Sequence, residues 1–252
     1  EQIVTAALLE DLREPVDPGT TAAADGNGWV LDGHKIAVRA AELASQILVP
    51  AKTANGITIF LVDPTADGVH LTALDTTTGQ PEADIRLNGV RVASEAIVGG
   101  LDQGAPIVAE MVLQANAALC SYAVGACESA LALTSDYIKT RKQFDQPIAM
   151  FQAVAHRAAD SYIDTEALRL VARQAAWRIS EGLPSETEVA IAAYWATTGG
   201  DRVLHAAQHL HGGVGVDRDY PLHRFFLAMR HLGLTMGGES RQLQALGRLV
   251  VD

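Results

Sequence analysis

The chain reads Arg141-Lys-Gln-Phe144-Asp-Gln-Pro147-Ile-Ala-Met-Phe151-Gln152 between two long helical patterns, and His211-Gly212-Gly213-Val-Gly215 follows about sixty residues later. Arg141 precedes a turn, so its head can project past a helix end and offer a planar fork of donors to phosphate oxygens. Gln152 adds an amide donor on the next helix. Gly212 and Gly213 carry no side chain, so their backbone N–H groups can approach a ligand closely. Together the two stretches predict a helical fold with a ligand site at helix ends.

The apolar pattern around these stretches is helical from residue 102 onward, with positions three and four apart. It begins with Val108, Met111, Val112, Ala115, Leu119, Tyr122 and Ala126. We expect one long helix to about Thr140 and a second over about 149–180. A third, to about His211, would start at Ser185 with Glu188 as a capping box. Shorter helices over about 220–234 and 240–250 complete a predicted antiparallel bundle, residues 101–252.

The first hundred residues have a different character. Short apolar runs such as Trp29-Val30-Leu31 and Ile57-Thr58-Ile59-Phe60-Leu61-Val62 alternate with Asn-Gly and Asp-Gly pairs. Strands at this spacing with these turn residues are typical of an antiparallel sandwich or barrel. The predicted fold class is therefore α+β, with a β-domain over residues 1–100 followed by the helical bundle.

Composition excludes several classes of function. The 252 residues carry a net charge of -11, which argues against nucleic-acid binding. No spacing of Cys and His is typical of a metal site. Cys120 and Cys127 lie seven apart on one predicted helix face and are expected to be buried free thiols. No apolar run approaches the roughly 20 residues of a membrane span, and no signal peptide opens the chain, so we expect a cytoplasmic protein.

Five motifs in this order resemble the acyl-CoA dehydrogenase family. They are Gly28-Trp29-Val30-Leu31-Asp32-Gly33-His34-Lys35, the stretch from Tyr137 through Arg141 and Phe144 to Gln152, His209-Leu210-His211-Gly212-Gly213-Val214-Gly215, Tyr220-Pro221-Leu222-His223-Arg224, and Gly237-Gly238-Glu239-Ser240. Asp145 stands where the family usually has Gly, and His209 where it usually has Gln. The family's N-terminal helical domain is absent, which implies a truncated or processed chain.

The resemblance implies that the helical bundle binds FAD belonging to the neighbouring subunit. The cofactor-binding residues would be Arg141, Phe144, Gln152, His209, Gly212 and Gly213. Each also has an ordinary structural interpretation, because an arginine at a helix end is often a solvated charge and a Gly-Gly pair often ends a helix. A histidine in such a place commonly packs or is solvated.

The carboxylate base of the family is missing from both of its usual places. The family's reaction removes the α proton of an acyl-CoA thioester and needs a carboxylate within reach of that carbon. One place corresponds to Gly237, and the other, counted back 26 residues from Arg141, is Ala115. Glu110 and Glu128 are off register by more than a turn on the same helix. We therefore predict no catalytic residue in this chain.

The part of the β-domain that should face a flavin also departs from the family. The stretch from Ala7 to Pro15 replaces "TEPxAGSD", and Ile36-Ala37-Val38-Arg39 replaces the "WITN" strand. This combination resembles the base-lacking subunit of actinobacterial heterotetrameric dehydrogenases that shorten steroid side chains. It implies a subunit with no base of its own that completes the FAD site of a second acyl-CoA dehydrogenase subunit carrying the catalytic Glu, with two copies of each subunit.

Two alternatives remain open at this point. The chain can be a self-sufficient flavoenzyme that uses Glu239 as base or performs a base-free, monooxygenase-like reaction. It can also be a purely structural partner of another dehydrogenase. Flavin content of the isolated chain and the effect of Arg141→Ala on the complex separate the three hypotheses.

Overall fold

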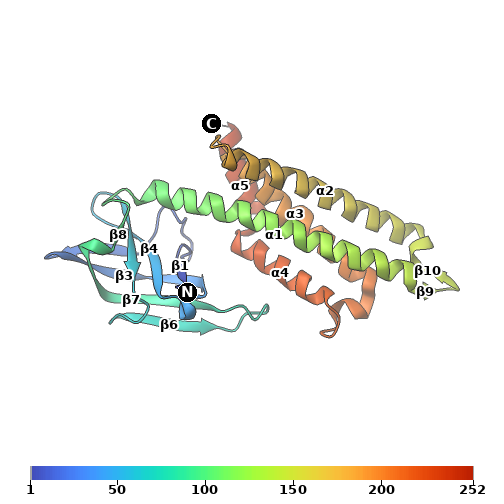
Figure 1. Ribbon diagram of the computed structural model, residues 1–252, viewed down its shortest axis with the longest axis horizontal. Coiled ribbons are helices and arrows are strands. Elements are labelled where there is room, and N and C mark those ends of the chain that lie inside the picture. The colour runs from blue at the N-terminus through green and yellow to red at the C-terminus, as the bar shows by residue number, and fades with distance from the viewer. Residues whose placement is uncertain (1, 252) are drawn as a thin grey trace. The chain divides into compact units, whose positions relative to one another are not determined.

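The computed structural model describes residues 2–251 and shows a β-rich unit followed by a helical one (Figure 1). The chain divides into two compact units between Val112 and Leu113. Helix α1 (Gly104–Thr140) begins in the first unit and continues through the second. The two predicted kinds of structure are confirmed in their predicted order.

The first unit is built on an eight-stranded sheet. Its strands are β1 (Val4–Ala6), β2 (Thr21–Asp25), β3 (Gly28–Arg39), β4 (Gln46–Lys52), β5 (Ile57–Val62), β6 (Val69–Leu74), β7 (Glu82–Ala93) and β8 (Ile97–Val98). The order is β6-β7-β3-β2-β4-β5-β8, with β1 paired to β4. Most pairs are antiparallel as expected, but β1 and β2 each pair with β4 in parallel. The sheet is therefore mixed. Strand β3 lies between β2 and β4 in the sequence, so the chain has reversed direction before β4 pairs with β2.

Alternation along the strands buries one set of apolar side chains in this unit. Leu31, Val49 and Phe60 are fully buried, and they share one core cluster with Ile85 and Leu87. Asn27 and Gly26, which has φ 60°, form the tight turn between β2 and β3. The hairpin expected at this glycine-containing stretch therefore forms, with Gly26-Asn27 as its turn and Gly28 as the first residue of β3.

The second unit is an antiparallel helical bundle. Besides α1 it contains α2 (Gln152–Ser180), α3 (Glu186–His211), α4 (Leu222–Thr235) and α5 (Gly238–Val251), with short 3₁₀ turns η3 (Ile148–Met150) and η4 (Gly212–Val216). A two-stranded hairpin of β9 (Lys142–Gln143) and β10 (Gln146–Pro147) connects α1 to α2. The five helices match the five that periodicity predicted.

The predicted capping box at the start of α3 is wrong. Ser185 makes no side-chain cap hydrogen bond, and its own N–H donates to Glu186 Oε2 at 2.9 Å. Glu188 instead pairs with Arg178 of α2 at 3.1 Å. The ion pair with Arg178 draws the Glu188 carboxylate away from the start of α3. A contact between two helices cannot be predicted from the local sequence.

Small side chains fill the core of the bundle. Cys127 of α1 lies against Gly200 of α3, where a Cβ would meet Met229 Cε at 2.7 Å and Cys127 Sγ at 3.6 Å. Cys120 and Cys127 are buried and free, as predicted, and burial raises the pKa of each thiol to about 12. Close helix packing through alanine and glycine explains why so few aromatic residues suffice.

Helix α1 is long and apolar enough to cross a membrane by length and composition, the one such helix among the described residues. The expectation that no apolar run approaches a span is therefore wrong on that criterion, because isolated Glu residues do not lower the mean hydropathy enough. Its Ala117, Cys120 and Ala123 are buried in the core cluster of the bundle. One side of α1 thus contributes to the hydrophobic core of the second unit.

Candidate functional site

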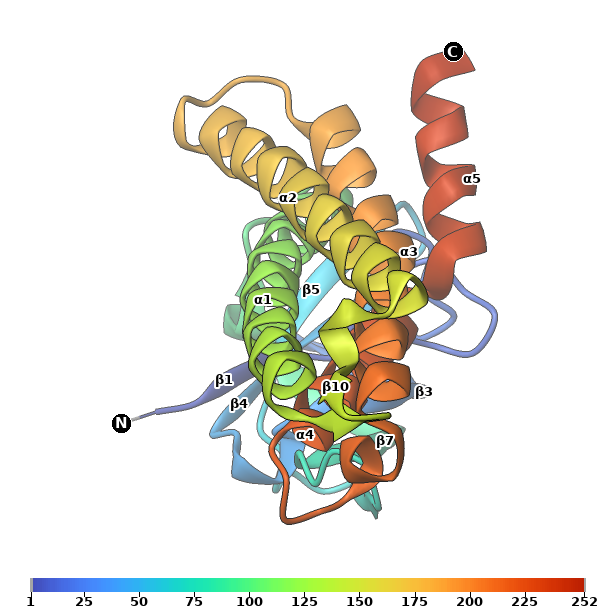
Figure 2. The same cartoon turned by 90° about the vertical axis from the view of Figure 1, so that its right-hand side faces the viewer.

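The hairpin after α1 carries the first predicted ligand-binding residue. Arg141 is the first residue past the helix, and its N–H donates to Tyr137 O at 2.8 Å while its carbonyl accepts from Ile148 N–H at 2.8 Å. Both backbone groups are thereby fixed and the side chain is exposed. Arg141 thus begins the hairpin at the end of the bundle where α1 stops and α2 starts; Figures 1 and 2 show this end with the strands β9 and β10.

Phe144 forms the tip of this hairpin. It is 88% exposed, and both it and Asp145 have positive φ, 52° and 65°. Its ring meets Phe151 edge-on with centroids 6.1 Å apart. Gln152, the first residue of α2, directly follows Phe151 and is exposed. An aromatic side chain this exposed on a two-residue turn suits contact with another molecule better than a place in the core.

The second glycine-containing segment is anchored to the same end of the bundle by Tyr137. The ring of Tyr137 stacks on His211 with centroids 4.3 Å apart, and its hydroxyl donates to His211 O at 3.3 Å. The buried His211 also bonds to Ala207 O through Nδ1 at 2.8 Å and to the Tyr220 hydroxyl through Nε2 at 3.1 Å. Burial lowers the pKa of His211. A neutral imidazole that donates from Nδ1 and accepts at Nε2 satisfies both contacts.

Gly212 and Gly213 follow directly and are open. A Cβ on either would meet nothing within 4 Å, and Gly212 has φ 61°. His209 is exposed one turn earlier and contacts Arg157 of α2 through Nδ1. Contacts within the chain therefore do not require glycine at these two positions. The missing side chains leave the backbone open at the surface. That openness fits a ligand approaching from outside.

The structure thus brings the predicted residues to one end of the bundle through contacts that the sequence did not reveal. Tyr137 supplies the link, since it bonds to Arg141 on one side and to His211 on the other. Sequence reasoning quoted Tyr137 as part of a motif but gave it no role, and it missed Arg157. The signal for Tyr137 was its place one helical turn before Arg141.

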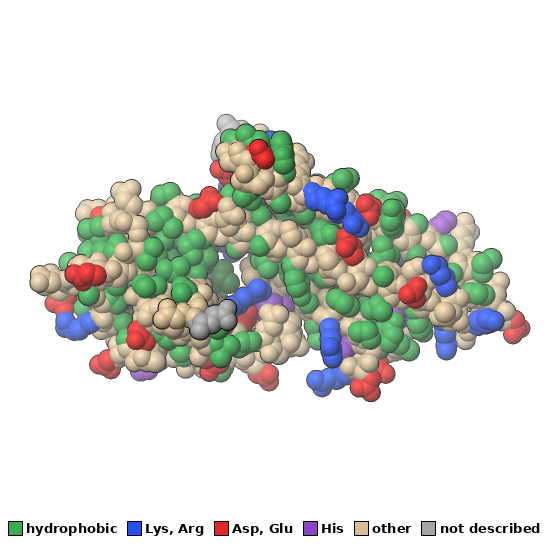
Figure 3. All heavy atoms as spheres, in the orientation of Figure 1, with side chains coloured by type: hydrophobic (Ala, Val, Ile, Leu, Met, Phe, Trp, Pro, Cys, Tyr) green, Lys and Arg blue, Asp and Glu red, His purple; other side chains and the backbone are tan. Residues whose placement is uncertain are grey.

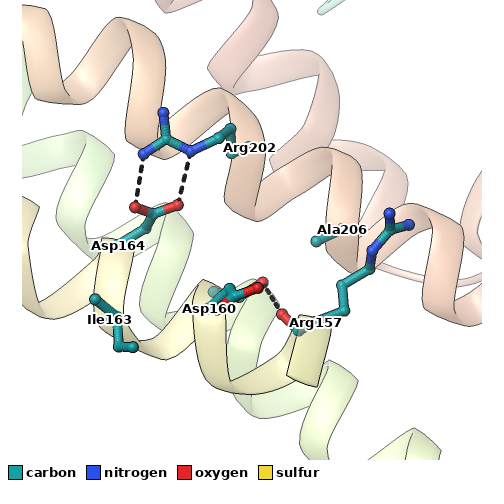
Figure 4. A pocket seen from close by; sticks show the side chains of 7 residues that line it. Arg157, Asp160, Ile163, Asp164, Arg202 and Ala206 are labelled. Carbon is teal, nitrogen blue, oxygen red and sulfur yellow. Dashed lines mark hydrogen bonds and ion pairs between the residues drawn. The ribbon is translucent and has the colours of Figure 1, made fainter. Parts of the chain in front are cut away.

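A separate pocket of about 310 Å³ lies between α2 and α3. Arg202 of α3 donates to both oxygens of Asp164 at 2.9 and 2.7 Å and forms one wall, with Ile163 and Asp160 on α2 and Ala206 on α3 (Figure 4). Arg157 of α2 also lines the pocket, so two arginines and two aspartates balance in charge, and the pocket does not select an anion or a cation. None of the six predicted ligand-binding residues lines it.

Comparison with known proteins now decides the family. Residues 13–90 match the model of the acyl-CoA dehydrogenase middle domain, and residues 102–250 match that of the acyl-CoA dehydrogenase C-terminal domain. The chain belongs to the acyl-CoA dehydrogenase family. Members are FAD-dependent oxidoreductases that act on CH–CH bonds. The family assignment confirms the fold, the class of enzyme and the cofactor expected from the motifs.

The chain is similar to acyl-CoA dehydrogenase FadE27 of Mycobacterium tuberculosis, with 40% identity over all of this chain and 68% of that protein. Among solved structures it is similar to the ChsE4-ChsE5 complex from Mycobacterium tuberculosis, with TM-score 0.92, 40% identity, and coverage of 100% of this chain and 67% of the other. It is also similar to the Tcur3481-Tcur3483 steroid acyl-CoA dehydrogenase G363A variant, with TM-score 0.89, 37% identity, and coverage of 99% and 67%.

The two positions expected from the resemblance to hold a base, Ala115 and Gly237, carry no carboxylate. Ala115 is exposed on α1, and Gly237 has φ 84° just before α5. A Cβ on residue 237 would overlap Cδ of Arg241 and stand 3.4 Å from Arg241 Cγ and Nε. An arginine side chain thus covers the place from which a base would project.

The acidic residues nearby are engaged elsewhere or face away. Glu128 pairs with Arg169 of α2. Glu239 is exposed in the first turn of α5, and its charge helps to raise the pKa of Arg202, after the larger effect of the hydrogen bond from Arg202 to Asp164. Glu239 therefore lies near enough to Arg202 of α3 for the two charges to interact.

In the β-rich unit, the stretch that replaces "TEPxAGSD" is tied down by a buried ion pair. Glu10 accepts from Lys35 Nζ at 2.5 Å, Thr20 Oγ1 at 2.7 Å and Gly19 N–H at 2.5 Å, and Lys35 also donates to Pro50 O. Burial pushes the pKa of Glu10 up, but the bonds from Lys35 and Thr20 outweigh it and leave that pKa below its usual value. The Glu10 carboxylate is therefore engaged in structural hydrogen bonds that fix the loop.

Proposed function

We propose that this chain is a subunit of a heteromeric acyl-CoA dehydrogenase that completes the FAD site of an unlike partner and has no catalytic base. The observation that carries the proposal is an asymmetry between two groups of residues. Arg141, Phe144 and Gly212 are presented openly at one end of the bundle. Ala115 and Gly237 occupy the positions of the base. The chain therefore keeps the residues that serve a neighbour's cofactor and lacks those that serve its own.

The relatives support a heteromeric assembly. Two solved structures similar to this chain are complexes of two differently named proteins, ChsE4-ChsE5 and Tcur3481-Tcur3483, and the second is described as a steroid acyl-CoA dehydrogenase. We propose by analogy that the substrate is an acyl-CoA thioester with a steroid side chain. The partner would carry the catalytic Glu, and the assembly would hold two copies of each subunit.

The roles of the residues follow from their chemistry. The guanidinium of Arg141 would pair with the diphosphate of FAD, since its fork matches phosphate oxygens. The open backbone at Gly212 and Gly213 would approach the adenine end, and the exposed ring of Phe144 would cover an apolar face of the cofactor. Gln152 and His209 would add donors at the rim. FAD, when bound, supplies the acceptor for the substrate hydride, while proton removal falls to the partner's base.

The test is native mass spectrometry of the full-length chain, alone and co-expressed with its partner subunit, counting FAD per assembly. We expect no FAD on the chain alone and one FAD per unlike pair in the complex. Arg141→Ala should lower FAD occupancy without preventing assembly, whereas Lys142→Ala, a neighbouring exposed cation, should leave occupancy unchanged. One FAD per chain in a homo-oligomer would overturn the proposal and favour a self-sufficient flavoenzyme. Unchanged FAD in Arg141→Ala would favour a purely structural partner.

A further inference from the structure

Arg157 lies in the second turn of α2 and lines the pocket between α2 and α3, but its charged end points elsewhere. Figure 4 shows the guanidinium turned away from Asp164 and extended along α3 past Ala206. Asp164 is already held by Arg202 through two hydrogen bonds. The group that Arg157 contacts is Nδ1 of His209, one turn beyond Ala206 on α3. The side chain of Arg157 thus pairs with the end of α3 rather than with the aspartate of the pocket.

The contact between Arg157 and His209 determines which imidazole nitrogen carries the proton. A guanidinium has N–H donors and no acceptor. Nδ1 of His209 therefore accepts the hydrogen bond from Arg157 Nη1 and carries no proton itself. An imidazolium has a proton on both nitrogens and cannot accept this bond. His209 is accordingly a neutral ring with its proton on Nε2.

The Nε2–H group of His209 is the one left for a ligand. His209 is exposed, and its Nε2 has no hydrogen-bond partner within the described part of the chain. Helix α3 ends two residues later, where the N–H of Gly212 donates to the carbonyls of Gln208 and His209. On the face shown in Figure 3, Lys, Arg and His side chains reach the surface of the helical unit near its β9–β10 end. His209 therefore offers a free donor directly before the open glycine pair.

A histidine held in this way can replace the glutamine that the family usually has at this position. The side-chain amide of glutamine always presents N–H donors. A free imidazole presents a donor or an acceptor at Nε2, according to its tautomer. With its proton fixed on Nε2, His209 is a donor like the amide. Arg157 thereby compensates for the departure from the family pattern at residue 209.

We propose that Arg157 is a positioning residue of the FAD site, which holds His209 as the Nε2–H tautomer so that this N–H donates to an acceptor atom of the cofactor. The inference rests on the proposed function, in which His209 lies at the rim of the partner's FAD. Arg157 acts through His209 and does not itself contact the cofactor. The effect of Arg157 should therefore disappear when residue 209 has no tautomer to fix.

FAD binding by the complex of the full-length chain with its partner subunit tests this dependence. Arg157→Ala should weaken FAD binding about 3- to 10-fold, the loss expected for one hydrogen bond. Arg157→Lys, which keeps a donor without an acceptor, should restore most of the affinity. In a His209→Gln background, Arg157→Ala should change the affinity by less than about 2-fold. Equal losses in both backgrounds would overturn the proposal, because Arg157 would then act on FAD without His209.

The protonation of Nδ1 is a readout that a merely structural contact would not move. Nitrogen NMR of the FAD-free complex, isotope-labelled on histidine, identifies the His209 signals as those lost in His209→Gln. At about pH 8, above the ordinary histidine pKa of about 6.5, Nδ1 should be unprotonated and Nε2 protonated. Arg157→Glu replaces the donor with an acceptor, so Nδ1 should gain a proton. A proton on Nδ1 without any substitution would contradict the proposal.

His205→Gln is the matched control on the same helix. Nδ1 of His205 lies 3.0 Å from Asp201 O, and its ring packs edge-on against Phe226 of α4 with centroids 5.1 Å apart. Since His205 faces α4, its substitution should leave FAD affinity unchanged.

Arg141→Ala separates this inference from the proposed function. If Arg141→Ala lowers FAD affinity and Arg157→Ala does not, the proposed function stands and the role of Arg157 is refuted. If neither variant changes FAD affinity, the proposed function fails, and the role of Arg157 at the cofactor fails with it. Loss of affinity in both, with the Arg157→Ala effect absent in His209→Gln, supports both.

Discussion

Gly237 is a position where any side chain, a carboxylate included, should destabilise the fold. Its φ of 84° lies in the region that side chains disfavour, and Arg241 occupies the space where a Cβ would stand. The left-handed conformation costs a non-glycine residue about 1–2 kcal/mol. Arg241 is only partly buried and can turn aside, so overlap with its side chain adds about 0.5–1.5 kcal/mol. The reduced entropy of the unfolded chain returns about 0.4–1 kcal/mol.

Gly237→Ala should therefore lower the free energy of unfolding by about 0.5–3 kcal/mol. The same change in an Arg241→Ala background should cost only about 1 kcal/mol, because the overlapping Cγ, Cδ and Nε atoms are gone and the backbone cost remains. Urea unfolding of the wild type, Gly237→Ala, Arg241→Ala and the double variant measures how much of the cost comes from the Arg241 side chain. The Gly237→Glu variant should likewise gain stability from Arg241→Ala.

The reasoning fails if Gly237→Ala costs the same with and without the Arg241 side chain, because the overlap would then contribute nothing. A cost below about 0.5 kcal/mol in both backgrounds would refute the backbone argument as well. A matched control is Gly213→Ala, where a Cβ would meet nothing within 4 Å and no positive φ is recorded. That change should have little effect on stability.

Two further predictions concern buried titratable groups. Lys35→Met should lower the free energy of unfolding by about 3–5 kcal/mol in urea titrations, because it leaves Glu10 buried without its cation, whereas Lys52→Met at the exposed pair with Asp17 should change little. The pKa of His211 is lowered by burial, so the unfolded chain takes up a proton near pH 6.5 before the folded one does, and the free energy of unfolding should fall as pH drops below about 6.5. His211→Gln should flatten that dependence, and an unchanged slope would exclude His211 as its source.

Local patterns were sufficient to predict the helices and the family's cofactor, and insufficient to predict contacts made at long range. Periodicity located the five helices, since an amphipathic helix repeats its apolar residues regardless of its partners. The parallel pairing of β1 with β4 and the ion pair that diverts Glu188 to Arg178 join residues far apart in sequence or on different helices. Tyr137 lay in a motif, but only the fold shows that its ring reaches His211.

The hairpin that follows Arg141 has an unfavourable backbone conformation at Asp145. Substitutions at Asp145, where the family usually has glycine, can measure its cost in folding free energy. Phe144 and Asp145 both have positive φ, and the family usually has glycine at the second of these positions. Aspartate adopts the left-handed region more readily than most residues, and glycine adopts it with no side-chain penalty. Asp145→Gly should therefore raise the free energy of unfolding by up to about 1 kcal/mol, and Asp145→Val should lower it by about 1–2 kcal/mol.

The same pair of variants separates backbone geometry from charge at the ligand end. Asp145→Gly also removes an acidic group four residues from the cation expected to meet a diphosphate, so FAD occupancy of the complex should stay the same or rise. Asp145→Asn keeps a residue tolerant of positive φ and removes only the charge. If Asp145→Gly stabilises the protein but Asp145→Asn does not, the turn is strained by its backbone conformation. If both stabilise it equally, the unfavourable contribution of Asp145 is electrostatic, and the argument from positive φ is wrong at this turn.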